Sequence, residues 1–197
     1  MSDRQRKAAA RTEHEAVAAL ERLQRSPIVD PGGVTFVYHG AADAVNLRCW
    51  IHGLPASQPF ERVGEHDLWV LRVELPENSR IEYKFEVVSD GHEEWILDPL
   101  NPLQAADPFG ANSVAQGHGY QRPEWTLPDA AARPGTLEEI ALASAALGDD
   151  RHVAVYVPAR FRRSRRYPLL VVHDGLDYLR YASLQGVLDN LIHRLEI

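Results

Sequence analysis

Hydrophobic and polar residues alternate in four short stretches between residues 34 and 87. Their apolar members are Val34, Phe36 and Tyr38; Val45, Leu47, Cys49 and Ile51; Trp69, Leu71, Val73 and Leu75; and Ile81, Tyr83, Phe85 and Val87. A period of two turns one face of a strand toward a core and the other toward water. Turn residues separate the stretches, at 39–40, 53–55 and 76–78. The pattern predicts an antiparallel β-sandwich.

The segments on either side of the alternation have a different character. Residues 3–24 are rich in Ala, Glu, Arg and Leu, with apolar residues near helical spacing, and predict one amphipathic helix that ends before Pro27. Residues 97–134 contain six prolines and are predicted to be mostly loop and linker. The predicted organisation is therefore an N-terminal helix over 1–26, a sandwich over 27–120 and a linker over 121–134.

From residue 135 onward the pattern changes again. Residues 137–146 and 152–158 predict two strands joined by a hairpin turn at 148–150. Residues 168–172, Pro-Leu-Leu-Val-Val, form a continuous apolar run of the kind that fills a parallel sheet buried on both faces. Residues 184–195 carry leucines and a valine at helical spacing. This order predicts the first strands and helix of an α/β domain over 135–197.

The amino-acid composition argues against several classes of function. The net charge of −7 argues against a general nucleic-acid binder, which would carry a basic face. A single cysteine, Cys49, excludes a disulfide within the chain and a multi-cysteine zinc site, and the nine histidines show no metal-ligand spacing. The sequence has no apolar run long enough for a membrane span and no secretory signal. We expect a cytoplasmic protein without metal, membrane or nucleic-acid partners.

Two stretches resemble a known family. Val34-Thr35-Phe36, Asp67-Leu68-Trp69, Ile81-Glu82-Tyr83-Lys84-Phe85, Leu97-Asp98-Pro99-Leu100-Asn101-Pro102 and Pro108-Phe109-Gly110-Ala111-Asn112-Ser113 resemble the immunoglobulin-like N-terminal domain of enterochelin esterases. That domain is related to a carbohydrate-binding module. His152-Val153-Ala154-Val155-Tyr156-Val157-Pro158 and Tyr167-Pro168-Leu169-Leu170-Val171-Val172-His173-Asp174-Gly175 look like the start of the esterase D-like α/β-hydrolase domain of the same proteins. The implied fold is a β-sandwich of the immunoglobulin-like, early-set type followed by an incomplete α/β-hydrolase domain.

The resemblance implies a serine esterase without a cofactor, acting on carboxylic esters, ferric siderophore esters among them. Such a hydrolase needs a serine in a sharp G-x-S-x-G turn, with an acid and a histidine after it. None of the serines in the chain lies in that motif. We therefore expect the nucleophile, acid and histidine of the parent to follow Ile197, and this chain to be inactive alone. The alternative is a non-catalytic module that binds a carbohydrate or a protein. Oligomerisation is left open by the sequence.

The candidate site is His173-Asp174-Gly175-Leu176, directly after the apolar run. In the resembling hydrolases the amide after this Asp-Gly forms half of the oxyanion hole. That role maps onto the Leu176 amide, with Gly175 allowing the backbone close to substrate. The other interpretation is a plain strand-to-helix turn. His173 and Asp174 stand in the wrong chain order for a triad of this fold, so both are interpreted as structural.

Two further groups of residues have a functional and a structural interpretation. Five arginines between 160 and 166 could attract an anionic substrate or partner, although a solvated connector is the more common role of such a loop. The four tryptophans could stack on sugar rings, but most tryptophans on sandwich strands belong to the core. Trp50 shares a strand face with Arg48 and His52, so it is expected to be the least core-like of the four.

Overall fold

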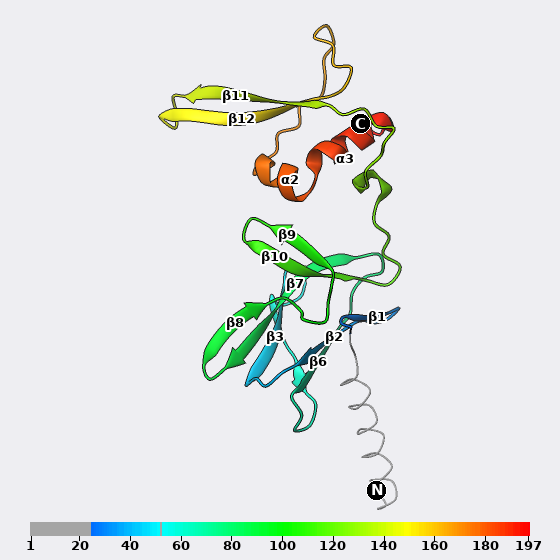
Figure 1. Ribbon diagram of the computed structural model, residues 1–197, viewed down its shortest axis with the longest axis vertical. Helices are drawn as coiled ribbons and strands as arrows, with labels where there is room; N and C mark the ends of the chain where they lie inside the picture. Colours follow the sequence, from blue (N-terminus) through cyan, green and yellow to red (C-terminus); the bar gives the residue numbers. More distant parts are fainter. Residues whose placement is uncertain (1–24, 52) are drawn as a thin grey trace, which may run out of the picture. The chain divides into compact units, whose positions relative to one another are not determined.

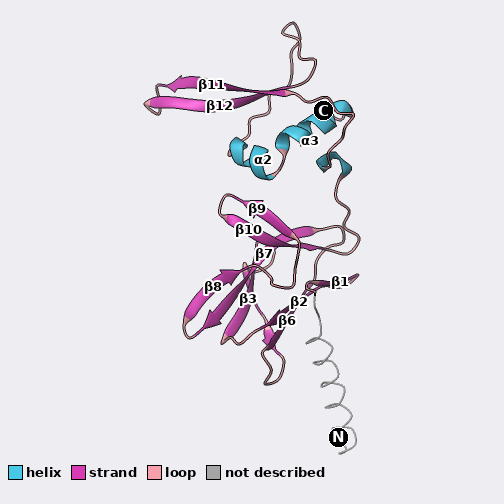
Figure 2. Ribbon diagram, in the orientation of Figure 1, coloured by secondary structure: helices cyan, strands magenta, loops and turns pink. Residues whose placement is uncertain are grey.

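The computed structural model describes residues 25–51 and 53–197, and the chain divides into two compact units, Met1–Gln121 and Arg122–Ile197 (Figure 1). Strands predominate, and the few helices described lie in the second unit (Figure 2). The helix predicted within residues 1–26 falls almost entirely outside the described residues. Arg25 and Ser26, which are described, are not helical.

Two antiparallel sheets build the first unit. One has the strand order β1-β2-β6-β5, with bounds Ile28–Asp30, Gly33–His39, Leu68–Val73 and Glu61–Arg62. The other has the order β4-β3-β7-β10-β9, and β8 pairs with β7 beside it. Its bounds are β4 Ser57–Pro59, β3 Ala44–Cys49, β7 Arg80–Ser89, β8 His92–Ile96, β9 Gln104–Asp107 and β10 Gly110–Gln116. The four alternating stretches of the sequence are thus confirmed as strands β2, β3, β6 and β7.

The core lies between these two sheets. Phe36 of β2 meets Tyr83 and Phe85 of β7, with ring centroids 4.8 and 6.4 Å apart, and all three side chains are buried. Edge-on contacts of this kind add specific geometry to the burial of large apolar area. In strand β3 the alternation in the sequence matches the alternation of burial. Val45, Leu47 and Cys49 are buried, whereas the residues between them are not.

A buried polar cluster fixes the connection between β8 and β9. The Asp98 carboxylate accepts hydrogen bonds from the Tyr83 hydroxyl at 2.7 Å and from the Leu100 amide at 2.9 Å. Asn101 donates to the Tyr83 oxygen and to the Val114 carbonyl, at 2.9 and 2.8 Å. Burial raises the pKa of Asp98, and burial beside Asp98 raises the pKa of Tyr83 above its ordinary range. The motif 97–102 is therefore a structural anchor, since its polar groups satisfy one another inside the sandwich.

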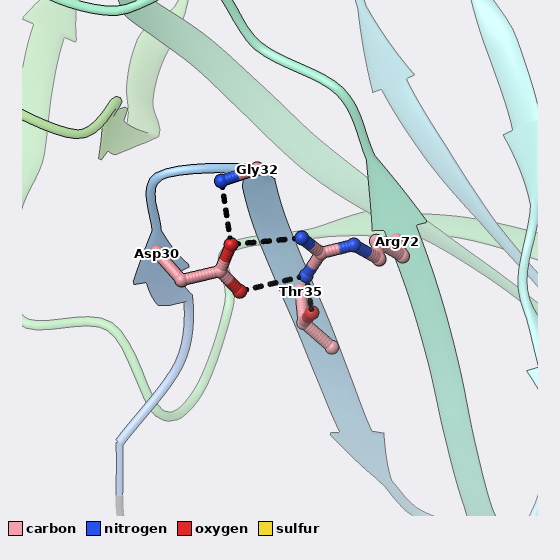
Figure 3. A network of polar contacts seen from close by, with 4 residues as sticks. All are labelled: Asp30, Gly32, Thr35 and Arg72. Atoms are coloured by element: carbon pink, nitrogen blue, oxygen red, sulfur yellow. Dashed lines mark hydrogen bonds and ion pairs between the residues drawn. The ribbon is translucent and has the colours of Figure 1, made fainter.

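An exposed ion pair joins β1 to β6 within the first sheet (Figure 3). Asp30 accepts two hydrogen bonds from the Arg72 guanidinium, both 2.8 Å long, and a third from the Gly32 amide at 2.8 Å. Arg72 also donates to the Thr35 hydroxyl at 3.2 Å. The hydrogen bonds from Arg72 and Gly32 lower the pKa of Asp30 to about 2. The bidentate geometry orders the β1–β2 turn against β6.

The prediction of mostly loop over 97–134 is wrong for part of that segment. Strands β9 and β10 lie within it, and β10 pairs with β7 in the middle of the second sheet. Six prolines had argued against strands, but Pro99, Pro102 and Pro108 precede or separate the two strands and Pro123, Pro128 and Pro134 follow them. No backbone amide within β9 or β10 is therefore lost to a proline.

The second unit begins with a short turn of 3-10 helix, η1 (Glu124–Thr126), and a hairpin of β11 (Thr136–Ser144) and β12 (Asp149–Val157). Helices α2 (Gly175–Tyr181) and α3 (Leu184–His193) follow. The hairpin and the helix predicted at 184–195 are confirmed. The buried strand predicted at 168–172 is wrong: the segment is not a strand, and Leu169, Leu170 and Val171 are 88, 65 and 70% exposed. A strand buried on both faces needs sheet neighbours, and in the described residues β11 and β12 pair only with each other.

Polar side chains of α3 hold the segment 125–135. The Asp189 carboxylate accepts hydrogen bonds from the Gly135 amide at 2.7 Å and from the Tyr156 hydroxyl at 2.6 Å. Asn190 donates to the carbonyls of Trp125 and Leu127, at 2.8 and 2.7 Å. Both side chains come from residues that are almost fully buried. One helix face thus fixes the chain entering β11.

Candidate functional site

The candidate site is the turn that leads into α2. Asp174 adopts the left-handed backbone conformation, with φ of 52°, and its carbonyl accepts hydrogen bonds from the amides of Asp177 and Tyr178 at 2.9 and 3.2 Å. Helix α2 starts one residue later, at Gly175. Aspartate tolerates this conformation better than most residues because its short side chain crowds the backbone little. Helix α2 therefore begins directly after a sharp turn of the backbone.

The predicted oxyanion hole depends on the backbone amide of Leu176. It lies in the first turn of α2, where backbone amides have no intrahelical acceptor. Among the described residues nothing accepts a hydrogen bond from it. The Leu176 side chain is 67% exposed. An amide in this state can donate to an incoming anion without first breaking another bond.

Gly175 is surrounded by open space. A Cβ atom built on it would meet no atom within 4 Å, and its φ is not in the left-handed region. Packing within the chain therefore does not require glycine here. The assignment of Gly175 and Leu176 stays a prediction.

His173 and Asp174 are exposed, and the structure gives neither side chain a hydrogen bond within the described residues. The Asp174 side chain does not cap α2. The two are adjacent in sequence at the same turn, but no nucleophilic serine of the described residues is hydrogen-bonded to either. The geometry contains no triad among the residues described.

The tryptophans divide into one buried and three exposed or half-exposed side chains. Trp69 is buried and donates from Nε1 to the Gly40 carbonyl at 3.2 Å. Trp50 is 78% exposed, which confirms that it is the least core-like of the four. The Arg48 guanidinium lies over the Trp95 ring at 4.5 Å from its centroid, and Glu86 accepts from Trp95 Nε1 at 3.2 Å. Trp95 is therefore engaged by its own sheet.

A shallow apolar depression of about 210 Å³ adjoins Trp50 and is also lined by Cys49, Ile51, Leu54 and Ala56. Burial raises the pKa of the Cys49 thiol, which accepts a hydrogen bond from Gln58 at 3.7 Å. A thiol whose anion is disfavoured is a poor nucleophile. Among the described residues, the lining of this depression contains no charged side chain.

Residues 25–51 and 53–197 contain neither a metal-binding cluster nor a membrane-spanning helix. No group of three or more His, Cys, Asp or Glu side chains in that part of the chain could hold a metal ion. None of the described helices is both long enough and apolar enough to cross a bilayer. These findings concern the described residues only.

Sequence reasoning missed the polar contacts that support the second unit. Gln185, Asp189 and Asn190 occur among leucines in a helix predicted from its apolar spacing alone. The adjacent Asp-Asn pair, inside a helix with few other polar residues, was the available signal. Polar residues in a mostly apolar helix often meet backbone groups of a neighbouring segment when they are buried.

Comparisons with known proteins give two kinds of match. Residues 144–197 match a family described as "Putative esterase". The ferric enterobactin esterase of Salmonella typhimurium matches with a TM-score of 0.61 at 19% identity, covering 90% of this chain and 55% of that chain. The enterochelin esterase of Shigella flexneri matches with a TM-score of 0.53 at 22% identity, covering 86% and 51%. A structure of the Shigella flexneri enterobactin esterase in the presence of enterobactin matches with a TM-score of 0.55 at 22% identity, covering 82% and 49%.

The chain spans about half the length of these esterase structures. At such identities the structural likeness concerns the fold, while the match over 144–197 concerns an esterase family. A comparison with curated proteins gives no match. The mostly-β architecture corresponds to the N-terminal part of the Salmonella esterase. The resemblance to enterochelin esterases expected from the sequence is thereby confirmed: residues 144–197 match an esterase family, and the fold is similar to that of enterobactin esterase structures.

Proposed function

We propose that this chain forms the immunoglobulin-like sandwich and the first part of the catalytic α/β-hydrolase domain of a serine esterase. The observation that carries the proposal is the order of features in one chain. Two packed antiparallel sheets come first, and the segment that matches an esterase family comes second. Structures with this same likeness over most of the chain are enterobactin esterases. Neither half of the chain alone would point as specifically to this group.

In this proposal the Leu176 amide is one of two donors to the oxyanion. The tetrahedral intermediate of ester hydrolysis places a negative charge on the former carbonyl oxygen, and donors that are free and fixed beforehand stabilise it. The Leu176 amide is free, and the left-handed turn at Asp174 fixes its position at the start of α2. The second donor would be the amide after the nucleophilic serine. The serine, acid and histidine would be supplied by residues of the parent that follow Ile197.

The proposed substrates are carboxylic esters of small molecules, with ferric siderophore esters as the specific class. This proposal is supported by the similar structures, which are enterobactin and enterochelin esterases. One of them was determined in the presence of enterobactin. The proposed site is a backbone donor, which recognises an ester carbonyl irrespective of the acid or alcohol part. Substrate specificity would then come from side chains around it. We propose a cytoplasmic location for this activity.

Two measurements test the proposal. The coding DNA downstream of Ile197 should continue in frame and contain a G-x-S-x-G motif. The parent protein should hydrolyse p-nitrophenyl esters and an iron-loaded trilactone siderophore, and a serine-directed fluorophosphonate should label it and abolish turnover. The 197-residue chain assayed beside it should show neither turnover nor labelling. A parent that is inert toward all these esters, or labelling of the 197-residue chain, would contradict the proposal.

A further inference from the structure

The loop that follows β12 carries a concentrated positive charge. This arginine loop, residues 159–167, contains Arg160, Arg162, Arg163, Arg165 and Arg166. All five are exposed, and none makes an ion pair within the described residues. The sequence has no Asp or Glu between Arg151 and Asp174 to offset them. Like charges so close together repel one another, so the loop gains from an anionic partner.

The arginine loop is closed by its own aromatic residues. The rings of Phe161 and Tyr167 stack with centroids 5.0 Å apart and an interplanar angle of 31°. The Arg162 amide donates to the Tyr167 hydroxyl at 3.0 Å, and the Arg165 amide donates to the Arg162 carbonyl at 3.0 Å. These contacts hold the two ends of the loop together. The loop that carries the five guanidinium groups therefore has a defined conformation and is not an extended, unstructured segment.

The form of the loop indicates the size of its partner. Residues 160–167 are exposed without exception. Small ligands bind in concave sites that remove most of their surface from water. A protruding, charged loop is suited instead to the surface of a macromolecule. Residues 168–173 lie between the loop and the turn at Asp174, so none of the five arginines belongs to the proposed oxyanion site.

The chain itself carries a surface of the opposite charge. Residues 25–121 contain six Lys or Arg against fourteen Asp or Glu, a net charge of −8, whereas residues 122–197 contain ten of each. At the β7–β8 turn Asp90, Glu93 and Glu94 are all exposed, and none of them forms an ion pair within the described residues. This acidic turn, residues 90–94, offers three carboxylates within five residues.

We propose that the arginine loop of one copy of this chain binds the acidic turn of a second copy. A guanidinium group binds a carboxylate with two parallel hydrogen bonds, so arginine suits such a contact. An extended polyanion such as a nucleic acid or an anionic bilayer would also face the remaining negative charge of a chain with net charge −7. A compact acidic patch on a second copy places only a few carboxylates at the contact, and the other charges of the two copies, more than about 8 Å away, are largely screened at physiological salt.

Sedimentation velocity on the full chain tests the association. At low salt we expect a species of twice the 22.1 kDa chain mass, and raising NaCl from about 0.05 to about 0.5 M should weaken the dimer at least tenfold. Replacing all five arginines of the loop by Gln should give a monomer under both conditions. The matched control R133Q/R180Q removes two exposed arginines of the same unit and should leave the dimer intact. A wild-type chain that is monomeric at low salt, or a loop variant that dimerises like wild type, would overturn the proposal.

A mixing experiment distinguishes this contact from other causes of association. One variant changes the five loop arginines to Glu, and the other is D90R/E93R/E94R; circular dichroism verifies that each is folded. Each variant alone should be monomeric. An equimolar mixture should form heterodimers, because the intact loop of one meets the intact acidic turn of the other, and the two reversed surfaces are also complementary. A mixture of folded variants that stays monomeric would refute the pairing of these two surfaces, as would dimers that persist in either variant alone.

Discussion

The hydrogen bonds of Asp189 offer a direct test of how the second unit is held together. Asp189→Ala removes the acceptor of both the Gly135 amide and the Tyr156 hydroxyl. Gly135 is buried, so its amide would lose its partner without gaining water. Hydrogen bonds to a charged acceptor contribute about 1.5–3 kcal/mol, and a buried donor left unsatisfied costs about as much. Since the carboxylate no longer has to be desolvated, we expect a net loss of about 3 kcal/mol for the pair.

Amide hydrogen exchange at Gly135 is the assay that isolates this loss. About 1.4 kcal/mol corresponds to a tenfold change in an equilibrium constant, so exchange should accelerate roughly a hundredfold in Asp189→Ala. Asp189→Asn keeps a neutral acceptor and should cost only about 1 kcal/mol. Asp150→Ala, on the exposed end of β12, is the matched control and should change nothing at Gly135. If Asp189→Ala and Asp150→Ala exchange alike at Gly135, the anchoring role assigned to Asp189 is wrong.

Three further outcomes are expected in the first unit. Phe36→Ala should destabilise the sandwich by about 3–5 kcal/mol in urea unfolding, because a large buried ring is lost from between the sheets; a loss below about 1 kcal/mol would contradict the core described. The pKa of Tyr83 is raised in the folded state. The contribution of Tyr83 to the free energy of unfolding is therefore fully present below pH 10, near the pKa of tyrosine in the unfolded chain, and it falls by about 1.4 kcal/mol per pH unit above that pH. Unfolding at pH 9 and 11 would reveal this, and an unchanged stability would refute it. NMR titration should give Asp30 a pKa of about 2, and Arg72→Gln should return it toward 3.8; because the folded pKa is lowered, the stabilisation is present above 3.8 and is lost as pH falls toward 2.

The alternating strands were predictable because one local rule decides them. In β3 each buried residue follows an exposed or half-exposed one, and the sequence shows the same alternation directly. Strand β10 gives no such signal, since Gly110-Ala111-Asn112-Ser113 is small and polar. Its place in the sheet depends on partners far away in the sequence, such as Tyr83 opposite Ser113. Pairing of this kind is a tertiary property that a local pattern does not contain.

The segment 168–172 shows the opposite failure. Its sequence has the composition of a buried parallel strand, yet in the structure it is exposed and unpaired. A parallel strand depends on neighbours on both sides and on helices over both faces, so its formation is decided by other segments. The candidate site next to it was predictable only through the resemblance. No local rule identifies a free backbone amide, because it follows from the position where α2 begins.

The Leu176 amide can be removed without removing the helix, and this gives the sharpest test of the proposed catalytic role. Leu176 lies in the first turn of α2, where proline is tolerated because the amide has no intrahelical acceptor. In the parent enzyme Leu176→Pro should lower kcat by roughly 10²–10³-fold, the usual effect of deleting one oxyanion donor. Leu176→Ala keeps the amide and removes an exposed side chain, so it should retain most of the activity. A Cβ atom built on Gly175 meets no atom within 4 Å, so a loss of kcat in Gly175→Val with thermal unfolding unchanged would point to crowding of the substrate. Equal activity in Leu176→Pro and Leu176→Ala, with thermal unfolding unchanged in both, would show that the turn after Asp174 contributes no donor to the reaction.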